Sequence, residues 1–280
     1  MNYDESASQI SRVQHSDSPQ LTCGLEKLTS KIRLKDLELY AENVYYPTAI
    51  NQFLEFWKRS TFIECLGLEI ERNEKQFFKD LQGVVDNLAL LRDSLLLYDM
   101  FMFLNGGTLL GWFRECSIIK HTTDVDAAVL AEEYNPEFLR DLFHQRHPFK
   151  IFRKLGKPDD SLEISVNPKN GEKINIDLYL MYSETNKNGS YSYVTGLSIT
   201  GEEFIYTYPI SHYNAYCSGD LGGHLFWVTC TPQKMLKHEY GKNWHRDFPS
   251  KNYYWQYSGS NIILKRKLSS FEMREQYKTY

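Results

Sequence analysis

The sequence lacks several features that would at once assign it to a class of proteins, such as zinc-binding or membrane-spanning proteins. Its five cysteines form no Cys-x-x-Cys pair and no other spacing expected of a zinc site. They allow at most two disulfides with one thiol left over, which leaves the redox compartment open. No stretch approaches the ~20 apolar residues of a membrane span. The first residues hold no basic segment followed by an apolar one. We therefore expect no membrane anchor or signal peptide in this chain, which fits a cytoplasmic protein or a truncated form.

An excess of positive charge is also missing. The chain has 32 Lys and Arg against 36 Asp and Glu, for a formal net charge of −4. Nucleic acid is therefore not an expected partner. A negative protein that handles anionic nucleotides would need metal cations at its site. The 20 tyrosines are many; they suit an aromatic core or a surface that binds sugars or nucleotides, and we favour the core.

The 280 residues suit one large domain with a smaller appendage. We divide the chain into a flexible polar tail (1–30), an accessory N-terminal segment (31–80), a main domain (81–260) and a C-terminal tail (261–280). Apolar periodicity predicts the elements of the main domain. Helices are expected over residues 76–100, 108–115, 136–147 and 231–240. Strands are expected over residues 100–104, 124–130, 149–153, 162–166, 173–181 and 225–228.

The turn Gly106-Gly107-Thr108 lies between a predicted strand and a short predicted helix. Glycine lets the backbone approach a ligand closely, and N–H groups at a helix N-terminus favour an anion. The turn is therefore a candidate cradle for donor phosphates, with an ordinary strand-to-helix turn as the alternative. Arg114, near the end of the helix, is a candidate clamp for the same phosphates. A structural salt bridge explains Arg114 equally well.

Two carboxylates follow on the next predicted strand. Asp124 and Asp126 share one face because residues two apart in a strand lie roughly 6–7 Å apart on the same side. Such a pair repels itself unless a cation lies between, and Mg²⁺ or Mn²⁺ is the natural occupant. Asp177 stands on the polar face of another predicted strand, opposite Ile176 and Leu178. If the two strands are neighbours, all three carboxylates converge as catalytic metal ligands. A lone Asp-x-Asp pair is more often a solvated strand edge, and it is the preceding glycine turn that favours catalysis.

The motifs as a set resemble the fukutin branch of the LicD-type transferases. The resemblance spans roughly residues 85–250, with the motifs in the family's order. It rests on Gly107-Thr108-Leu109-Leu110-Gly111-Trp112-Phe113-Arg114, Ile118-Ile119, Asp124-Val125-Asp126, Asn175-Ile176-Asp177-Leu178-Tyr179, Phe226-Trp227-Val228 and Glu239-Tyr240-Gly241-Lys242-Asn243-Trp244.

The resemblance implies an α/β (α+β) protein with a nucleotidyltransferase-like mixed β-sheet flanked by helices. It implies a phosphotransferase that moves an alditol phosphate or choline phosphate from a CDP-activated donor to a glycan. In the fukutin branch the donor is CDP-ribitol and the acceptor is a glycoprotein O-mannosyl glycan in the Golgi. In that role Asp124, Asp126 and Asp177 would hold the metal, and Arg114 would neutralise developing charge.

The chain departs from the family at two points. No anchor is visible, and Lys120-His121-Thr122-Thr123 stand where bacterial members place extra acidic residues. Alternatives therefore stay open. They are a nucleotidyltransferase acting on a small molecule or protein, and a catalytically degenerate glycan-binding or scaffold protein. A GT-A glycosyltransferase also uses an Asp-x-Asp pair, but it lacks the Gly-Thr turn upstream.

Overall fold

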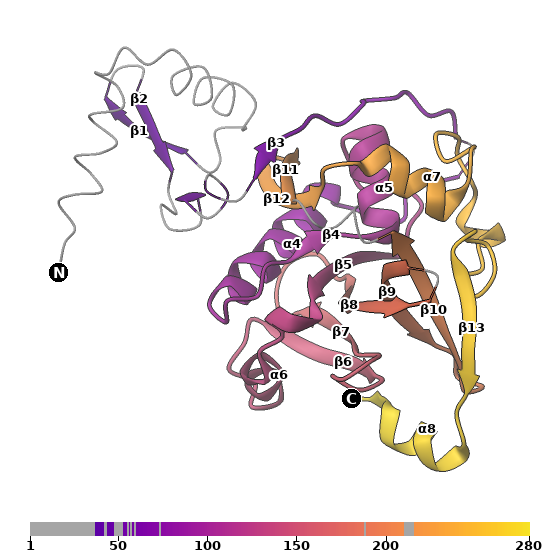
Figure 1. Cartoon of the computed structure of the whole chain (residues 1–280). Coiled ribbons are helices and arrows are strands. Elements are labelled where there is room, and N and C mark those ends of the chain that lie inside the picture. Colours follow the sequence, from indigo (N-terminus) through magenta and orange to yellow (C-terminus); the bar gives the residue numbers. More distant parts are fainter. Residues whose placement is uncertain are drawn as a thin grey trace.

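A computed structural model describes residues 37–41, 44–47, 53–54, 56, 58, 60–72, 74–187, 189–209 and 216–280 (Figure 1). The segment expected as a flexible tail, 1–30, lies outside the described residues, as does part of the accessory segment. The described helices are α4 (Leu81–Leu96), α5 (Gly106–Glu115), α6 (Pro136–Phe143), α7 (Pro232–Tyr240) and α8 (Ser270–Gln276), with 3-10 turns at Ala131–Glu133 and Ser250–Asn252. In this part of the chain, no helix has both the length and the apolar character to cross a bilayer.

The described strands form two sheets. The smaller pairs β1 (Leu37–Ala41) with β2 (Val44–Pro47). The strands of the larger sheet are β3 (Thr61–Phe62), β4 (Phe103–Leu104), β5 (Asp124–Leu130), β6 (Phe149–Leu155), β7 (Glu163–Pro168), β8 (Asn175–Asn186), β9 (Gly189–Leu197), β10 (Glu202–Pro209), β11 (Tyr216–Leu221), β12 (His224–Thr229), β13 (Ile262–Lys267) and β14 (Tyr277–Thr279).

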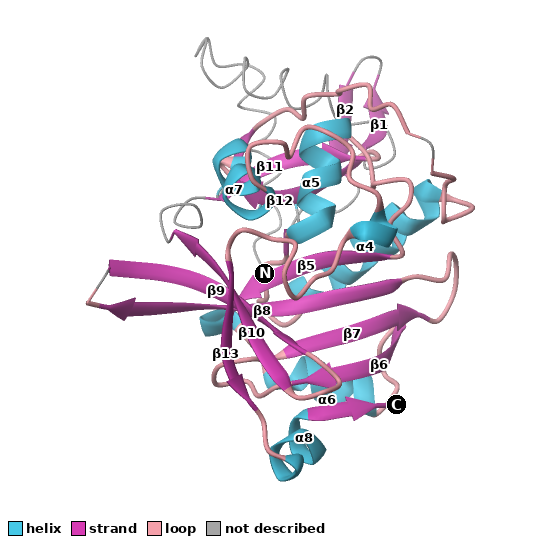
Figure 2. Ribbon diagram, turned by 90° about the vertical axis from the view of Figure 1, so that its right-hand side faces the viewer, coloured by secondary structure: helices cyan, strands magenta, loops and turns pink. Residues whose placement is uncertain are grey.

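The large sheet is mixed, and its order is β13-β10-β9-β8-β5-β4-β12-β11-β3, with β7, β6 and β14 branching from β8. β5 and β8 are parallel, whereas β7 is antiparallel to β8. The long strand β8 pairs with β5 and β7 in its first part and with β9 in its second. Figure 2 shows β5, β8, β7 and β6 side by side. The expected α/β fold, with a mixed sheet flanked by helices, is confirmed.

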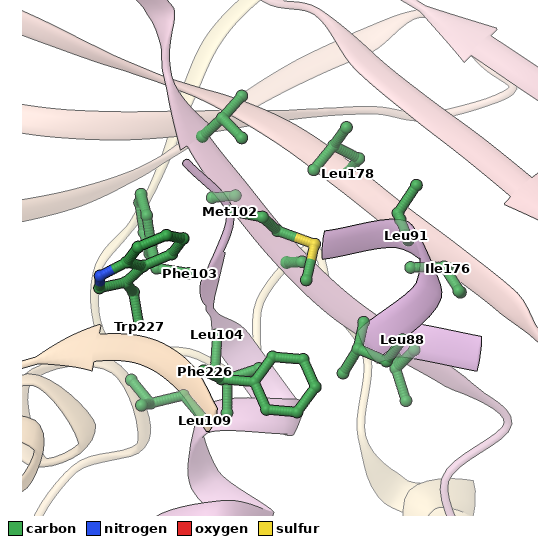
Figure 3. Packing of buried hydrophobic residues seen from close by; sticks show 14 of the residues in the cluster. Leu88, Leu91, Met102, Phe103, Leu104, Leu109, Ile176, Leu178, Phe226 and Trp227 are labelled. Atoms are coloured by element: carbon green, nitrogen blue, oxygen red, sulfur yellow. The ribbon is translucent and has the colours of Figure 1, made fainter. Parts of the chain in front are cut away.

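One face of this sheet is the core. Val125 and Ala127 of β5 and Ile176 and Leu178 of β8 are at most 1% exposed. Side chains of α4 at helical spacing, including Leu88 and Leu91, lie over β8 on this face (Figure 3). Each fully buried side chain of this size contributes about 1.5–3 kcal/mol through its removal from water. Because successive strand residues alternate in direction, the residues between these apolar ones face the other side.

The structure differs from the expected elements at several ends. The strand expected over 100–104 pairs only at Phe103–Leu104, and the helix expected from 108 already begins at Gly106. Residues 261–280, expected as a tail, contain β13, α8 and β14, and both strands join the sheet. A capping box between Ser269 and Glu272 begins α8. That Ser-x-x-Glu pattern is a readable start signal for a helix.

Two disulfides join described residues, Cys65 to Cys116 and Cys217 to Cys230. The first links the segment before α4 to the end of α5, and the second joins β11 to the residue after β12. Both pairs fit the limit of two set by the cysteine count, and Cys23 lies outside the described residues. Disulfides persist mainly in oxidising compartments.

Candidate functional site

The structure brings the three predicted carboxylates to one face of the sheet. In the parallel pairing of β5 with β8, Asp126 lies opposite Asp177 and Asp124 lies opposite Asn175. The intervening residues Val125 and Ile176 are fully buried on the core face. Asp124, Asp126 and Asp177 therefore share the polar face, which we call the acidic face.

Without a counter-ion, burial and mutual repulsion disfavour the ionised form of the three carboxylates of the acidic face. Burial is the main cause that raises the pKa of Asp124, and it raises the pKa of Asp126 well above its ordinary value, with the charges of Asp124 and Asp177 adding to it. The pKa of Asp177 rises to about 6 through burial, opposed by the charge of Arg153 and a hydrogen bond from Ser165. A nearby cation favours the ionised form of all three groups.

The glycine turn packs directly against this face. The backbone N–H of Gly107 donates to Oδ2 of Asp126 over 3.0 Å, and the Asp126 N–H donates to the Thr108 hydroxyl over 2.7 Å. Gly106 has φ +50°, and a Cβ there would lie 2.9 Å from Oδ2 of Asp126. The turn therefore orients Asp126. Its role as a phosphate cradle stays a prediction, and two of its polar groups are already engaged within the protein.

Arg114 lines the same cavity but is only 2% exposed. Its Nε donates to Glu115 over 2.8 Å, and its Nη1 donates to the carbonyl oxygen of Arg246 over 2.8 Å. The second bond ties α5 to the segment after α7. The expected role of Arg114 as a phosphate clamp stays a prediction, and the geometry favours a structural part for it.

A cavity of about 750 Å³ opens over the acidic face. This volume suits a small-molecule ligand. The three aspartates and the two glycines of the turn contribute to its wall, and tyrosines, two tryptophans and a phenylalanine form much of the rest. The aromatic lining residues are Tyr179, Tyr206, Tyr208, Tyr240, Trp244, Phe248, Tyr253 and Trp255.

Sequence reasoning missed three polar residues beside Asp177. The Ser165 hydroxyl donates to Oδ1 of Asp177. Nη2 of Arg153 lies 2.7 Å from Oε1 of Glu163 and 3.6 Å from Oδ1 of Asp177. Glu163 is 4% exposed, and burial raises its pKa to about 8. The signal was present, because Glu163 and Ser165 alternate with apolar residues in the same manner as Asp177.

A further acidic residue reaches the cavity from α7. Glu239 is 3% exposed, and the Tyr208 hydroxyl donates to its Oε2 over 3.2 Å. Burial raises the pKa of Glu239 to about 7. Its position in the sequence, directly before Tyr240-Gly241, is the signal that could have singled it out.

Comparison with known proteins agrees with this arrangement. Residues 99–224 match the family described as "LicD/FKTN/FKRP, nucleotidyltransferase domain", and this range holds all three aspartates. Two uncharacterized Caenorhabditis elegans proteins, T07A5.1 and W02B3.4, are 43% and 41% identical over 85% and 86% of this chain. The Homo sapiens ribitol-5-phosphate transferase FKTN is 28% identical over 78% of it. These matches cover 63%, 62% and 47% of the respective relatives, so the chain spans less than two thirds of their length.

The mixed sheet carries an acidic face beside a glycine turn, in a region that matches a nucleotidyltransferase domain. The class that these features define is the nucleotidyltransferase-type domain. Residues 99–224 form a LicD-type domain of the fukutin-related kind. The family resemblance drawn from the motifs is thereby confirmed.

Proposed function

We propose that this protein is a metal-dependent phosphotransferase that moves an alditol phosphate, ribitol phosphate first among them, from a CDP-activated donor to a glycan of a glycoprotein. The observation that carries the proposal is the register of Asp126 opposite Asp177 on the acidic face of a family domain. The likeness to a ribitol-5-phosphate transferase supports the choice of donor.

The acidic face suits Mg²⁺ or Mn²⁺. The hydrogen bonds of its carboxylates engage Oδ1 of Asp124, Oδ2 of Asp126 and Oδ1 of Asp177, so the second oxygen of each is directed elsewhere. Among the described residues, no three acidic, histidine or cysteine side chains are arranged to hold one ion as they stand. Mg²⁺ commonly takes only one or two carboxylates and completes its shell with substrate phosphates and water. When bound, the ion would neutralise charge on the transferred phosphate.

The chain's own residues would bind and orient the donor and would deprotonate the acceptor hydroxyl. In the proposed reaction an acceptor hydroxyl forms a new bond to the phosphorus that carries the alditol, and the bond from that phosphorus to CMP breaks with its electron pair on CMP. The acceptor proton passes to a carboxylate oxygen of the acidic face. The Gly107 turn would hold Asp126 in place during this step.

We propose the Golgi lumen as the site of action. The family membership and the two disulfides support an oxidising compartment of the secretory pathway.

Thermal protection tests the proposal directly. CDP-ribitol, CDP-glycerol and CDP-choline are each added with Mg²⁺ or Mn²⁺, and the melting temperature is followed. A donor at a hundred times its dissociation constant adds about 2.7 kcal/mol to the free energy of unfolding. Protection by CDP-ribitol together with transfer of ribitol phosphate to a glycan is the expected outcome. Absence of protection by all three compounds contradicts it.

The second candidate is transfer of the nucleotidyl group itself, which the name of the matched domain favours. A donor labelled separately in its two halves separates the candidates, because only one half reaches the acceptor in each case. A degenerate scaffold would transfer neither half, and calorimetry with Mg²⁺ or Mn²⁺ would then show whether the acidic face still binds a cation.

A further inference from the structure

One row of side chains crosses four neighbouring strands of the acidic face. Arg153 of β6 lies opposite Ser165 of β7, Ser165 lies opposite Asp177 of β8, and Asp177 lies opposite Asp126 of β5. Cross-strand partners on one face are close neighbours. The row therefore places a guanidinium two strands from Asp177 and three from Asp126, beside the predicted metal ligands.

A β-bulge is what brings Arg153 to this face. The register of β6 with β7 shifts between Ile151 and Arg153, and Ile151 lies opposite Val166, which is buried in the core. In a regular strand, residues two apart share a face, so Arg153 would point with Ile151 into the core. The extra residue of the bulge turns Arg153 to the polar side instead. Bulges that re-aim a side chain in this way are frequent next to active sites.

The guanidinium of Arg153 still has hydrogen-bonding capacity. Its Nη2 reaches Glu163 over 2.7 Å, while its Nε is buried and has no hydrogen-bond partner among the described residues. A guanidinium carries five N–H donors in a planar fork. A buried donor without an acceptor points to a group that arrives with the ligand, and Arg153 lines the cavity.

Arg153 and Arg114 contrast sharply in accessibility. The side chain of Arg153 is 28% exposed, whereas that of Arg114 is 2% exposed and is bonded to Glu115 and to carbonyl oxygens of the chain. Of the two guanidinium groups, that of Arg153 is therefore the more accessible to an oxyanion that enters the cavity.

We propose that Arg153 binds a phosphate oxyanion of the donor, and that Glu163 is the positioning residue that holds its guanidinium. The proposal rests on the proposed function, since it names a phosphate-binding residue of that same site. Arginine suits the task because its fork bonds two oxygens of one phosphate. Asp177, 3.6 Å from the same Nη2, sets the guanidinium beside the acidic face, where the reacting phosphate would lie.

Calorimetry with CDP and with cytidine, both in the presence of Mg²⁺, tests this proposal. Arg153→Gln should weaken CDP binding roughly ten- to a hundredfold, as expected for a lost hydrogen bond to a charged group, and leave cytidine binding unchanged. Lys150→Gln is the matched control, because Lys150 is an exposed cation on the same strand; its CDP affinity should equal that of the wild type. Wild-type CDP affinity in Arg153→Gln overturns the proposal.

Two further variants keep the test decisive if Arg153→Gln fails to fold. Arg153→Lys keeps the charge and removes the fork, so it should still weaken CDP binding. Glu163→Gln should weaken it less, and adding Glu163→Gln to Arg153→Lys should cost little more than Arg153→Lys alone, since both act through one contact. Additive losses overturn the positioning role. If the wild type binds CDP normally and the Arg153 variants do too, only this inference fails. If the wild type binds no CDP, both this inference and the proposed function fail.

Discussion

The backbone N–H of Gly107 donates to Oδ2 of Asp126 over 3.0 Å, across a separation of 19 residues. The Asp126 N–H in turn donates to the hydroxyl of Thr108. The glycine turn and the acidic strand are therefore one structural unit, in which the start of α5 orients the carboxylate at the centre of the site.

The double substitution Asp124→Asn with Asp126→Asn should abolish transfer and leave the metal-free protein as stable as the wild type or more so. Burial and mutual repulsion raise the pKa of both groups, so their neutral replacements fit the metal-free site better. Transfer activity and the melting temperature in EDTA are measured. Asp159→Asn, at an exposed position, serves as the control. Retained activity in the double variant would rule out this site.

Metal binding should weaken below about pH 6, because Asp177 has a pKa of about 6 and a protonated carboxyl is a poor ligand. Asp177→Asn should remove most of the activity. It should also raise the stability of the metal-free protein above pH 6. The sign follows from linkage: the pKa of Asp177 is higher in the folded state than its ordinary 3.8, so its cost to folding is present above pH 6 and disappears as the pH falls towards 4. Calorimetric titration with Mn²⁺ between pH 5 and 8 gives the affinity. An affinity that does not change with pH contradicts the prediction.

Gly106→Ala should destabilise the protein more than Gly107→Ala. Gly106 has φ +50° and its Cβ would lie 2.9 Å from Oδ2 of Asp126, whereas the Cβ of an alanine at 107 would lie at an ordinary 3.4 Å. Left-handed backbone costs a residue with a side chain roughly 1–2 kcal/mol. Urea unfolding of both variants gives the difference. If the turn also binds phosphate, Gly107→Val should reduce the favourable free energy of CDP binding more than it reduces the free energy of unfolding. A CDP affinity equal to that of the wild type would assign the turn a structural role alone.

The protein should lose stability as the pH falls from about 6.5 towards 4, through His147. This residue is 4% exposed, it contacts Phe138 edge to face at 5.1 Å, and neither ring nitrogen has a hydrogen-bond partner among the described residues. Burial lowers its pKa to about 4, and Lys169 adds to the effect while Asp141 opposes it. The unfolded chain therefore takes up a proton first, at a cost of up to about 3 kcal/mol to folding. His147→Phe should flatten this part of the stability profile measured by denaturant titration. An unchanged profile in His147→Phe would place the pH dependence in other groups.

Local pattern determined much of this protein. The local sequence was enough to predict the strand over residues 124–130, which matches β5 in full, and alternation of apolar and polar residues was enough to place Asp177 on a polar face. Helical periodicity located α4, and the order of the motifs was enough to identify the family. The strand, the polar face and the helix follow from residues within a few positions of each other, and the order of the motifs is read directly along the chain, so the sequence alone carries them.

Only the tertiary structure decided the rest. The register that sets Asp126 opposite Asp177 joins strands about 50 residues apart in sequence, and no local pattern specifies it. The bulge before Arg153 reverses the side that alternation predicts for that residue. Arg114 is buried by carbonyl groups 130 and 132 residues away, which no spacing around it could indicate. In each case the deciding contact is long-range, and long-range contacts are formed by packing of the whole sheet.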